Sequence, residues 1–207
     1  MSEELVFYTN PMSRGRIARW MLEEVDATYR VEPLIYNESM KSAEYLAINP
    51  MGKVPAITHR GQTITECAAI CAYLADAFPE AGLAPAPADR GAYYRWLFFA
   101  AGPVEAAVTT KAVGFTPPAD KAGMLGYGTF ENAIDTLEKA VSGGGWIAGP
   151  DFSAADVYVG AQIGWGLQFG SIPKRVAFEA YAAKVQARPA YQRASELDDK
   201  LMAELQS

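Results

Sequence analysis

A proline-rich segment divides this chain into two halves with different patterns. Residues 79–87 read PEAGLAPAP, and three prolines and a glycine spaced this closely rule out both a helix and a central strand. Short strand and helix patterns alternate before this segment, whereas helical patterns follow it. We therefore expect two domains, residues 1–79 and residues 88–207, joined by a linker at residues 80–87.

The first half is predicted to be a compact α/β unit with the element order β-α-β-α-β-β-α. Strands are expected at 5–8 and 29–35 and, as a hairpin, at 55–58 and 62–65; helices are expected at 17–25, 41–48 and 68–78. This order is typical of a thioredoxin-like domain. The second half is predicted to be all-α, with helices near 88–115, 119–142, 154–168, 174–187 and 189–205. Gly102-Pro103 should bend the first of these helices.

Composition and charge exclude several classes of function. The formal net charge of −6 argues against nucleic acid as the main partner, because phosphate binding needs a basic face. The apolar runs are too short to span a bilayer and the start is acidic, so we expect no membrane partner and a cytoplasmic location. The single histidine, His59, is interpreted as a surface residue and leaves little material for a metal site. Cys67 and Cys71 are interpreted as small buried side chains.

The segment Asn49–Ile57, NPMGKVPAI, has the features of a binding site for a short peptide with charged ends. Pro55 opens a strand without a backbone N–H, and it favours extended geometry at Val54. We expect a cis Val54–Pro55 bond that turns the N–H and C=O of Val54 outward, where an extended ligand can pair with them. Lys53 and Glu66 supply one charge of each sign nearby.

Four short motifs, in this order and at these spacings, resemble the cytosolic glutathione transferase family. They are Asn10–Ser13 (NPMS), Asn49–Pro55 (NPMGKVP), Glu66-Cys67 and Ser153–Asp156 (SAAD). The resemblance covers essentially the whole chain and is to serine-type members, such as the phi and theta classes and related bacterial enzymes. It implies glutathione as co-substrate and its conjugation to hydrophobic electrophiles, a reaction of detoxification. The alternatives are a glutathione-dependent isomerase, dehalogenase or peroxidase, and a non-catalytic protein that binds glutathione or another ligand.

The resemblance places Ser13 at the glutathione thiol as the catalytic residue. A serine hydroxyl is a poor base, but it can donate a hydrogen bond that favours the thiolate. Lowering a thiol pKa by about two units takes roughly 2.7 kcal/mol, which one charge-assisted hydrogen bond and a helix N-terminus can supply. The alternative is that Ser13 only caps the first helix. Asn10 is a second candidate for stabilising the thiolate, whereas Tyr8 is interpreted as core.

The resemblance assigns the other glutathione contacts to charged side chains and backbone groups. Glu66 pairs with the γ-glutamyl ammonium, and the N–H of Cys67, at a helix start, binds the γ-glutamyl carboxylate. Lys53 and Lys41 bind the glycyl carboxylate, and Val54 pairs with the peptide backbone. Many members of the family have a serine in place of Cys67.

The resemblance also implies an apolar acceptor pocket and a homodimer. The pocket is expected between the domains, lined by Met12, Phe115, Tyr127 and Trp165, although each of these side chains can instead be core. Members of the family usually dimerise by inserting an aromatic side chain into the partner. Met51 stands at that position here, and a methionine is apolar and adaptable enough to serve.

Two helix starts carry further expectations. The motif Ser153–Asp156 resembles the capping box that begins the central helix of the second domain. Arg14, Arg16 and Arg19 lie in the opening turns of the first helix, where positive charge opposes the helix dipole. Their charge can help to hold a thiolate, but we interpret them as structural, with pairs such as Arg19 with Glu23.

Overall fold

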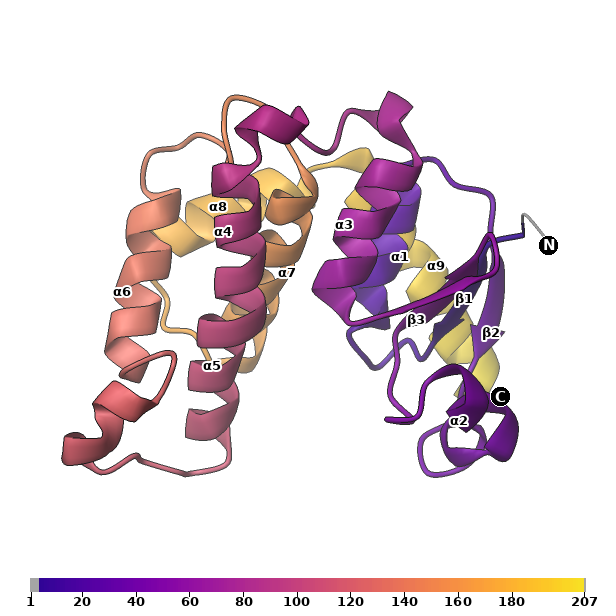
Figure 1. Cartoon of the computed structure of the whole chain (residues 1–207), viewed down its shortest axis with the longest axis horizontal. Coiled ribbons are helices and arrows are strands. Elements are labelled where there is room, and N and C mark those ends of the chain that lie inside the picture. The colour runs from indigo at the N-terminus through magenta and orange to yellow at the C-terminus, as the bar shows by residue number, and fades with distance from the viewer. Residues whose placement is uncertain (1–3, 207) are drawn as a thin grey trace. The chain divides into compact units, whose positions relative to one another are not determined.

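The structure, a computed structural model, describes residues 4–206 apart from the side chain of Ala119. The chain forms two compact units (Figure 1): unit 1 is Met1–Leu83 with Arg188–Ser207, and unit 2 is Ala84–Ala187. The last helix was expected to belong to the helical domain, residues 88–207. The structure instead groups this helix, α9 (Pro189–Gln206), with unit 1, because it packs along α1 (Gly15–Glu24).

Unit 1 is built on a four-stranded mixed sheet with the strand order β2-β1-β3-β4. Strand β1 (Val6–Thr9) runs parallel to β2 (Arg30–Pro33) and antiparallel to β3 (Ala56–His59), which forms a hairpin with β4 (Gln62–Thr65). The two central strands are mostly buried, whereas the edge strands β2 and β4 are partly exposed. The predicted thioredoxin-like domain is confirmed.

Three helices complete the α/β part of unit 1. Helices α1 and α3 (Cys67–Ala77) pack side by side, and α2 (Ala43–Ile48) follows a 3₁₀ turn at Ser39–Lys41 (Figure 1). Tyr8 packs against a small buried cluster that includes Tyr45 of α2, with 5.6 Å between the two ring centroids. Tyr8 is therefore part of the packing, as expected.

The expectation that His59 is a surface residue is wrong. His59 is 5% exposed, its Nδ1 lies 3.0 Å from the Tyr73 hydroxyl, and its ring stacks on Phe78 at 5.7 Å. The reason is topological. Strand β3 lies between β1 and β4, so its last residue is covered by α3 and the segment that follows it.

Helix α9 is joined to α1 by ion pairs. The buried Arg19 donates through Nε to Asp198 Oδ1 at 2.8 Å. The expected pair of Arg19 with Glu23 is therefore wrong, because Glu23 accepts from the Tyr29 hydroxyl at 2.7 Å and from Arg193 at 3.3 Å. A buried guanidinium needs a buried carboxylate, and α9 supplies one from the far end of the chain.

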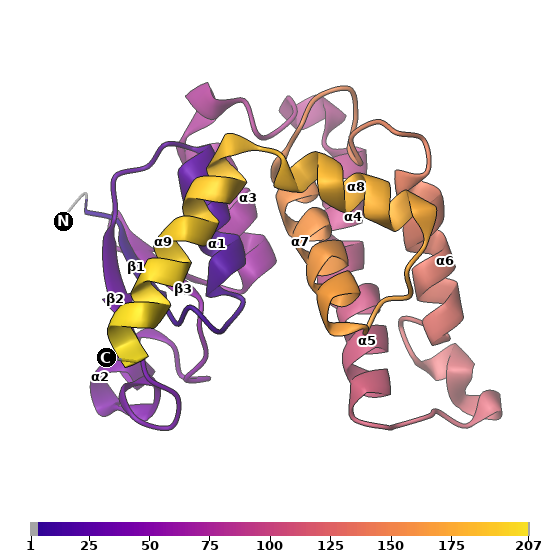
Figure 2. The ribbon, with the colours of Figure 1, turned by 180° about the vertical axis from the view of Figure 1, so that it is seen from behind.

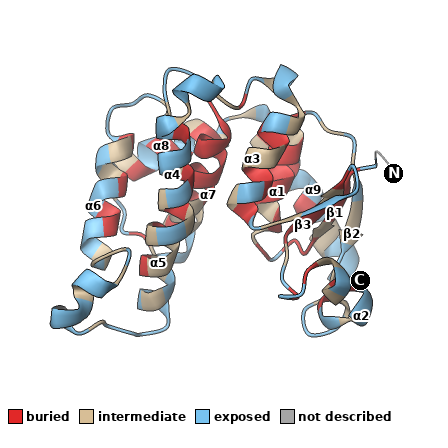
Figure 3. Ribbon diagram, viewed as in Figure 1, coloured by how far each residue is buried: buried red, intermediate tan, exposed pale blue. Residues whose placement is uncertain are grey.

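Unit 2 is helical, as predicted, with α4 (Gly91–Phe99), α5 (Glu105–Ala112), α6 (Phe130–Val141), α7 (Ala154–Phe169) and α8 (Val176–Gln186). Helix α7 is buried along most of its length (Figure 3). A π-helical turn at Ala100–Val104 contains Pro103, where a bend was expected. Among residues 4–206, the helices are too short or too polar to cross a membrane.

The expectation of one helix over residues 119–142 is wrong. The structure has a 3₁₀ segment at Ala119–Met124, an irregular stretch and then α6. Gly128 has a φ of 66°, a left-handed conformation that ends any right-handed helix. Thr129 then caps α6 by accepting from the Asn132 N–H at 3.1 Å.

Helix α7 begins with the predicted capping box. The carboxylate of Asp156 is fully buried and accepts from both the N–H and the hydroxyl of Ser153 at 2.9 Å. Its other oxygen accepts from the Ile147 N–H at 2.8 Å and the Tyr181 hydroxyl at 2.6 Å. Burial, together with Asp156, raises the pKa of Tyr181, so its hydroxyl remains a donor. Asp156 thus joins three segments of unit 2.

Candidate functional site

The loops that the sequence singled out lie together where β1 ends, at one end of the strands of the unit 1 sheet, and we call this end the sheet edge. Tyr8 pairs with Ala56, and Ala56 with Thr65, so the residues after β1, before β3 and after β4 lie at the same edge. These residues are Asn10–Ser13, Lys53–Pro55 and Glu66-Cys67. Two of the loops are in contact, because the thiol of Cys67 donates to the carbonyl oxygen of Arg14 at 3.6 Å.

Ser13 lies in a tight turn directly before α1. Its hydroxyl donates to the carbonyl oxygen of Asn10 at 2.6 Å and accepts from the N–H of Gly15 at 2.9 Å. A hydroxyl has a single proton, so donation to a thiolate requires the side chain to turn away from Asn10. The bond from Gly15 also supports the first turn of α1, although the helix itself starts after Arg14. The geometry is therefore compatible with both roles considered for Ser13.

Asn10 is engaged at both ends of its amide group. Its Nδ2 donates to the carbonyl oxygen of Leu34 at 2.8 Å, and its Oδ1 accepts from the N–H of Met12 at 2.9 Å. These bonds fix the loop to the segment that follows β2. The side chain of Met12 is 70% exposed at the surface of the same loop.

The backbone of Val54 is unpaired at this edge. The Val54–Pro55 bond is cis, as expected. The carbonyl oxygen of Lys53 accepts from the Tyr45 hydroxyl at 2.5 Å and from Asn49 Nδ2 at 2.8 Å, and burial raises the pKa of Tyr45 to about 12. Within residues 4–206, neither the N–H nor the C=O of Val54 has a hydrogen-bond partner. An extended peptide can satisfy both groups.

The turn at Glu66-Cys67 opens helix α3. Glu66 has a φ of 65°, which is uncommon for a residue other than glycine. Such conformations persist where the surrounding structure enforces them, often at ligand sites. The turn leaves the side chain of Glu66 exposed and that of Cys67 buried, and it directs the start of α3 to the sheet edge. The N-terminus of an 11-residue helix attracts a carboxylate.

The two predicted lysines have different surroundings. Lys41 donates through Nζ to the carbonyl oxygens of Gly52 at 2.9 Å and Met51 at 3.2 Å, so it braces the loop before Val54. Lys53 is exposed, and its ammonium has no ion-pair partner in the described part of the chain. Lys53 is thus the better placed of the two to accept a ligand carboxylate.

The other three predicted pocket residues lie in unit 2. Phe115 follows α5 and is 54% exposed. Tyr127 precedes α6, and its buried hydroxyl has no hydrogen-bond partner among the described residues. Trp165 of α7 packs edge-on against Phe169, with 6.3 Å between ring centroids. Their role in substrate binding remains a prediction.

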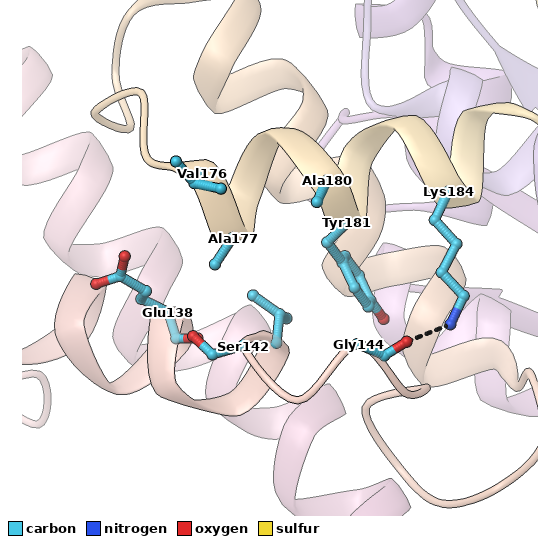
Figure 4. A pocket seen from close by; sticks show the side chains of 9 residues that line it. Glu138, Ser142, Gly144, Val176, Ala177, Ala180, Tyr181 and Lys184 are labelled. Carbon is cyan, nitrogen blue, oxygen red and sulfur yellow. Dashed lines mark hydrogen bonds between the residues drawn. The ribbon is translucent and has the colours of Figure 1, made fainter.

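A cavity of about 490 Å³ in unit 2 lies between α8 and the end of α6 (Figure 4). Its polar groups are already bonded within the protein. Lys184 donates to the Gly144 carbonyl oxygen at 3.0 Å, Glu138 pairs with Arg175, and Tyr181 donates to Asp156. The remaining lining residues are Val141, Ser142, Val176, Ala177 and Ala180. We assign no ligand to this cavity.

Three further residues brace the loops, and none of them was predicted to do so. Tyr45 and Asn49 hold the Lys53 carbonyl, and Arg16 donates through Nε to the Pro11 carbonyl oxygen at 2.6 Å. Asn49 lies in the segment already singled out and Arg16 was interpreted as structural, but local patterns give no signal for Tyr45. Within residues 4–206, the structure contains no cluster of His, Cys, Asp and Glu side chains suited to a metal ion.

The fold and this edge define a class of protein: a thioredoxin-like domain with an unpaired backbone segment before a cis proline, followed in the chain by a helical unit. The glutathione S-transferase N-terminal domain family matches residues 3–76. Residues 3–76 thus belong to the glutathione S-transferase N-terminal domain family, and the chain as a whole is similar to cytosolic glutathione transferases.

Known relatives resemble both units. Glutathione S-transferase GstA of Escherichia coli O157:H7 is 31% identical over 126 residues, 59% of this chain and 61% of that protein. The structure of a glutathione transferase from Methylococcus capsulatus has a TM-score of 0.77 and 28% identity, and the match covers 94% of this chain and 98% of that chain. A sphingomonad glutathione S-transferase complexed with glutathione has a TM-score of 0.74, 28% identity and the same coverage. The chain spans less than two thirds of the length of GstA and of two further curated relatives.

Proposed function

We propose that this protein binds glutathione at the sheet edge of unit 1 and conjugates its thiolate to hydrophobic electrophiles. The observation that carries the proposal is the unpaired backbone of Val54, which offers one donor and one acceptor to an extended peptide. Glutathione has a peptide backbone between charged ends. A glutathione-bound relative with 28% identity over nearly the whole chain supports this ligand.

In the proposed complex the charges at the sheet edge hold the two ends of glutathione. The exposed Glu66 pairs with the γ-glutamyl ammonium, and the start of α3 at Cys67 binds the adjacent carboxylate. Lys53 binds the glycyl carboxylate. Lys41 contributes to this contact indirectly, because it braces the loop that carries Lys53. The cysteine thiol of glutathione then lies towards the turn that contains Asn10 and Ser13.

The proposed chemistry is nucleophilic attack by the glutathione thiolate. On binding, the Ser13 hydroxyl turns from the Asn10 carbonyl and donates to the sulfur, and the thiol proton leaves to water. The sulfur then forms a bond to an electrophilic carbon, and the leaving group departs with its bonding electrons. Asn10 is the weaker candidate for this role, because both ends of its amide are already engaged.

The proposal also includes the residues that bind the electrophile and the contact that forms a homodimer. We assign Met12, Phe115, Tyr127 and Trp165 to the binding of an apolar substrate, which suits the apolar part of each side chain. Met51, 68% exposed beside the Val54 loop, is proposed as the contact with a second copy in a cytoplasmic homodimer.

A glutathione titration with and without an electrophile panel tests the proposal. Glu66→Ala should weaken glutathione binding about tenfold, the loss expected for one hydrogen bond to a charged group. Glu131→Ala is the matched control, because Glu131 is an exposed acid in the first turn of α6 in unit 2. Equal affinities in the two variants would count against the site. Binding of glutathione without turnover of any electrophile would instead favour the non-catalytic alternative. Glutathione-dependent isomerisation, dehalogenation or peroxide reduction, if observed, would identify the protein as the corresponding alternative enzyme.

A further inference from the structure

We propose that Arg16 is a positioning residue for glutathione ionisation, and that the C-terminal helix α9 holds it in place through Asp199. The inference rests on the proposed function of the Asn10–Ser13 turn. It extends that function, because a helix from the opposite end of the chain helps to position the residues of the thiol site.

Arg16 joins the turn to α9 with one side chain. Its Nε donates to the Pro11 carbonyl oxygen at 2.6 Å, and its Nη2 donates to Asp199 Oδ1 at 2.7 Å. The arginine side chain is 26% exposed, whereas that of Asp199 is 62% exposed. The planar guanidinium fork allows both bonds at once, and a lysine ammonium cannot reproduce that geometry.

The bond to Pro11 fixes a peptide group that belongs to the thiol site. The Pro11 carbonyl and the Met12 N–H are the two ends of one planar peptide. Arg16 holds the oxygen end, and Asn10 Oδ1 holds the N–H end at 2.9 Å. Rotation of this peptide would displace Asn10 and, one residue further on, the hydroxyl of Ser13. Arg16 therefore sets the position from which Ser13 must turn towards the thiol.

Helix α9 lies along α1 (Figure 2), and a row of ion pairs that includes Arg16 joins the two helices. The row contains Arg16 with Asp199, Arg19 with Asp198 and Glu23 with Arg193, and Arg188, directly before α9, pairs with Glu24. The pair at Arg16 lies next to the turn, whereas the pair at Arg193 lies at the other end of α1. This arrangement provides a matched control, since Arg193 joins the same two helices without contacting the turn.

The test compares Arg16→Met, Arg16→Lys and Arg193→Met in the full chain. For each variant, the pKa of the thiol of bound glutathione is measured from the pH dependence of the thiolate absorbance. Hydrogen exchange of the Met12 amide reports the position of the loop without reference to glutathione.

Arg16→Met and Arg16→Lys are both expected to raise the thiol pKa by about one unit, equivalent to about a tenfold loss of thiolate below that pKa. Both should also speed exchange of the Met12 amide severalfold. Arg193→Met should change neither quantity, although it too removes an α1–α9 ion pair. Asp199→Ala should give the same changes as Arg16→Met at a smaller size.

Three results would overturn the inference. One is an Arg16→Met variant that matches Arg193→Met in both measurements. Another is full rescue by Arg16→Lys, which would assign the effect to charge alone. The third is faster Met12 exchange in Arg16→Met with no change of thiol pKa, while Ser13→Ala does raise that pKa. If the parent protein does not lower the thiol pKa of glutathione, the proposed function fails. The Met12 exchange rates distinguish this case, because they show separately whether Arg16 holds the turn.

Discussion

Helices α1 and α7 each have a serine at or just before their start, and the two starts are built differently. At α7, Ser153 and Asp156 form a capping box in which the buried carboxylate accepts four hydrogen bonds. At α1, the residue three positions after Ser13 is Arg16, the first turn contains no acid, and the hydroxyl of Ser13 bonds only within its own turn.

The difference separates a start that stabilises the fold from one that leaves groups for a ligand. The α7 start satisfies its donors from within unit 2, so a change there should act on stability. The α1 start has positive side chains, a hydroxyl that can turn and a neighbouring unpaired backbone at Val54. A change there should act mainly on glutathione.

The largest expected effect is on the α7 start. Asp156→Ala should lower the free energy of unfolding by about 3–5 kcal/mol, because it leaves the buried donors of Ser153, Ile147 and Tyr181 without an acceptor. This exceeds the roughly 1–2 kcal/mol expected for a lost helix cap alone. Denaturant unfolding measures the change, and a loss below about 1 kcal/mol would remove the contrast between the two starts.

The next effect tests how closely the α1 start is packed. A Cβ atom on Gly15 would lie 2.0 Å from Thr9 Oγ1 and 3.0 Å from Ser13 Oγ. Gly15→Ala should therefore cost about 1–3 kcal/mol by overpacking. In the double variant Thr9→Ala/Gly15→Ala, the hydroxyl that clashes is gone, so most of this loss should be recovered. Strictly additive losses in the double-mutant cycle would show that the clash is not the cause.

A second comparison is between two buried carboxylates, Asp156 at the α7 start and Asp198 beside α1, and here the expected effect is smallest. Asp156 accepts four hydrogen bonds, whereas Asp198 Oδ1 accepts from Arg19 and its Oδ2 has no partner among the described residues. Burial raises the pKa of Asp198, although Arg19 beside it acts in the opposite direction. The native state therefore binds this proton more tightly than the unfolded chain does.

Asp198 should consequently contribute most to stability when it is protonated. That contribution is present below the unfolded pKa, about 3.9, and is lost as the pH rises through the raised native value. The parent should lose stability relative to Asp198→Asn over this window, as measured by denaturant unfolding at a series of pH values. A parent that gains stability over the same window would show that the attraction of Arg19 outweighs burial.

Local patterns were enough to predict much of the fold and part of the candidate site. The strand and helix order of unit 1, the cis bond before Pro55 and the capping box at Ser153 each depend on residues close together in sequence. The register of the strands in the unit 1 sheet then brings the Val54 and Glu66 loops to one edge. This juxtaposition follows from strand pairing that the hairpin pattern already implied.

The contacts that could not be predicted are those made across long distances in sequence. Arg16 and Asp199 are 183 positions apart, and Arg19 and Asp198 are 179 apart, so spacing rules on one helix could not find them. The same holds for α9 itself, whose amphipathic pattern shows a helix but not the partner that it covers. Within a loop, the pattern also could not show that the Ser13 proton is directed to Asn10.

The central claim is that Ser13 promotes ionisation of bound glutathione, and the thiol pKa of bound glutathione tests it most directly. It is measured for the parent, Ser13→Ala and Ser153→Ala, the last serving as a control that removes a helix-start serine from unit 2. The account predicts that Ser13→Ala raises the thiol pKa by about 1–2 units, the equivalent of one hydrogen bond to a charged group, while Ser153→Ala lowers stability and leaves the pKa unchanged. An unchanged thiol pKa in Ser13→Ala, with glutathione still bound, would contradict the claim.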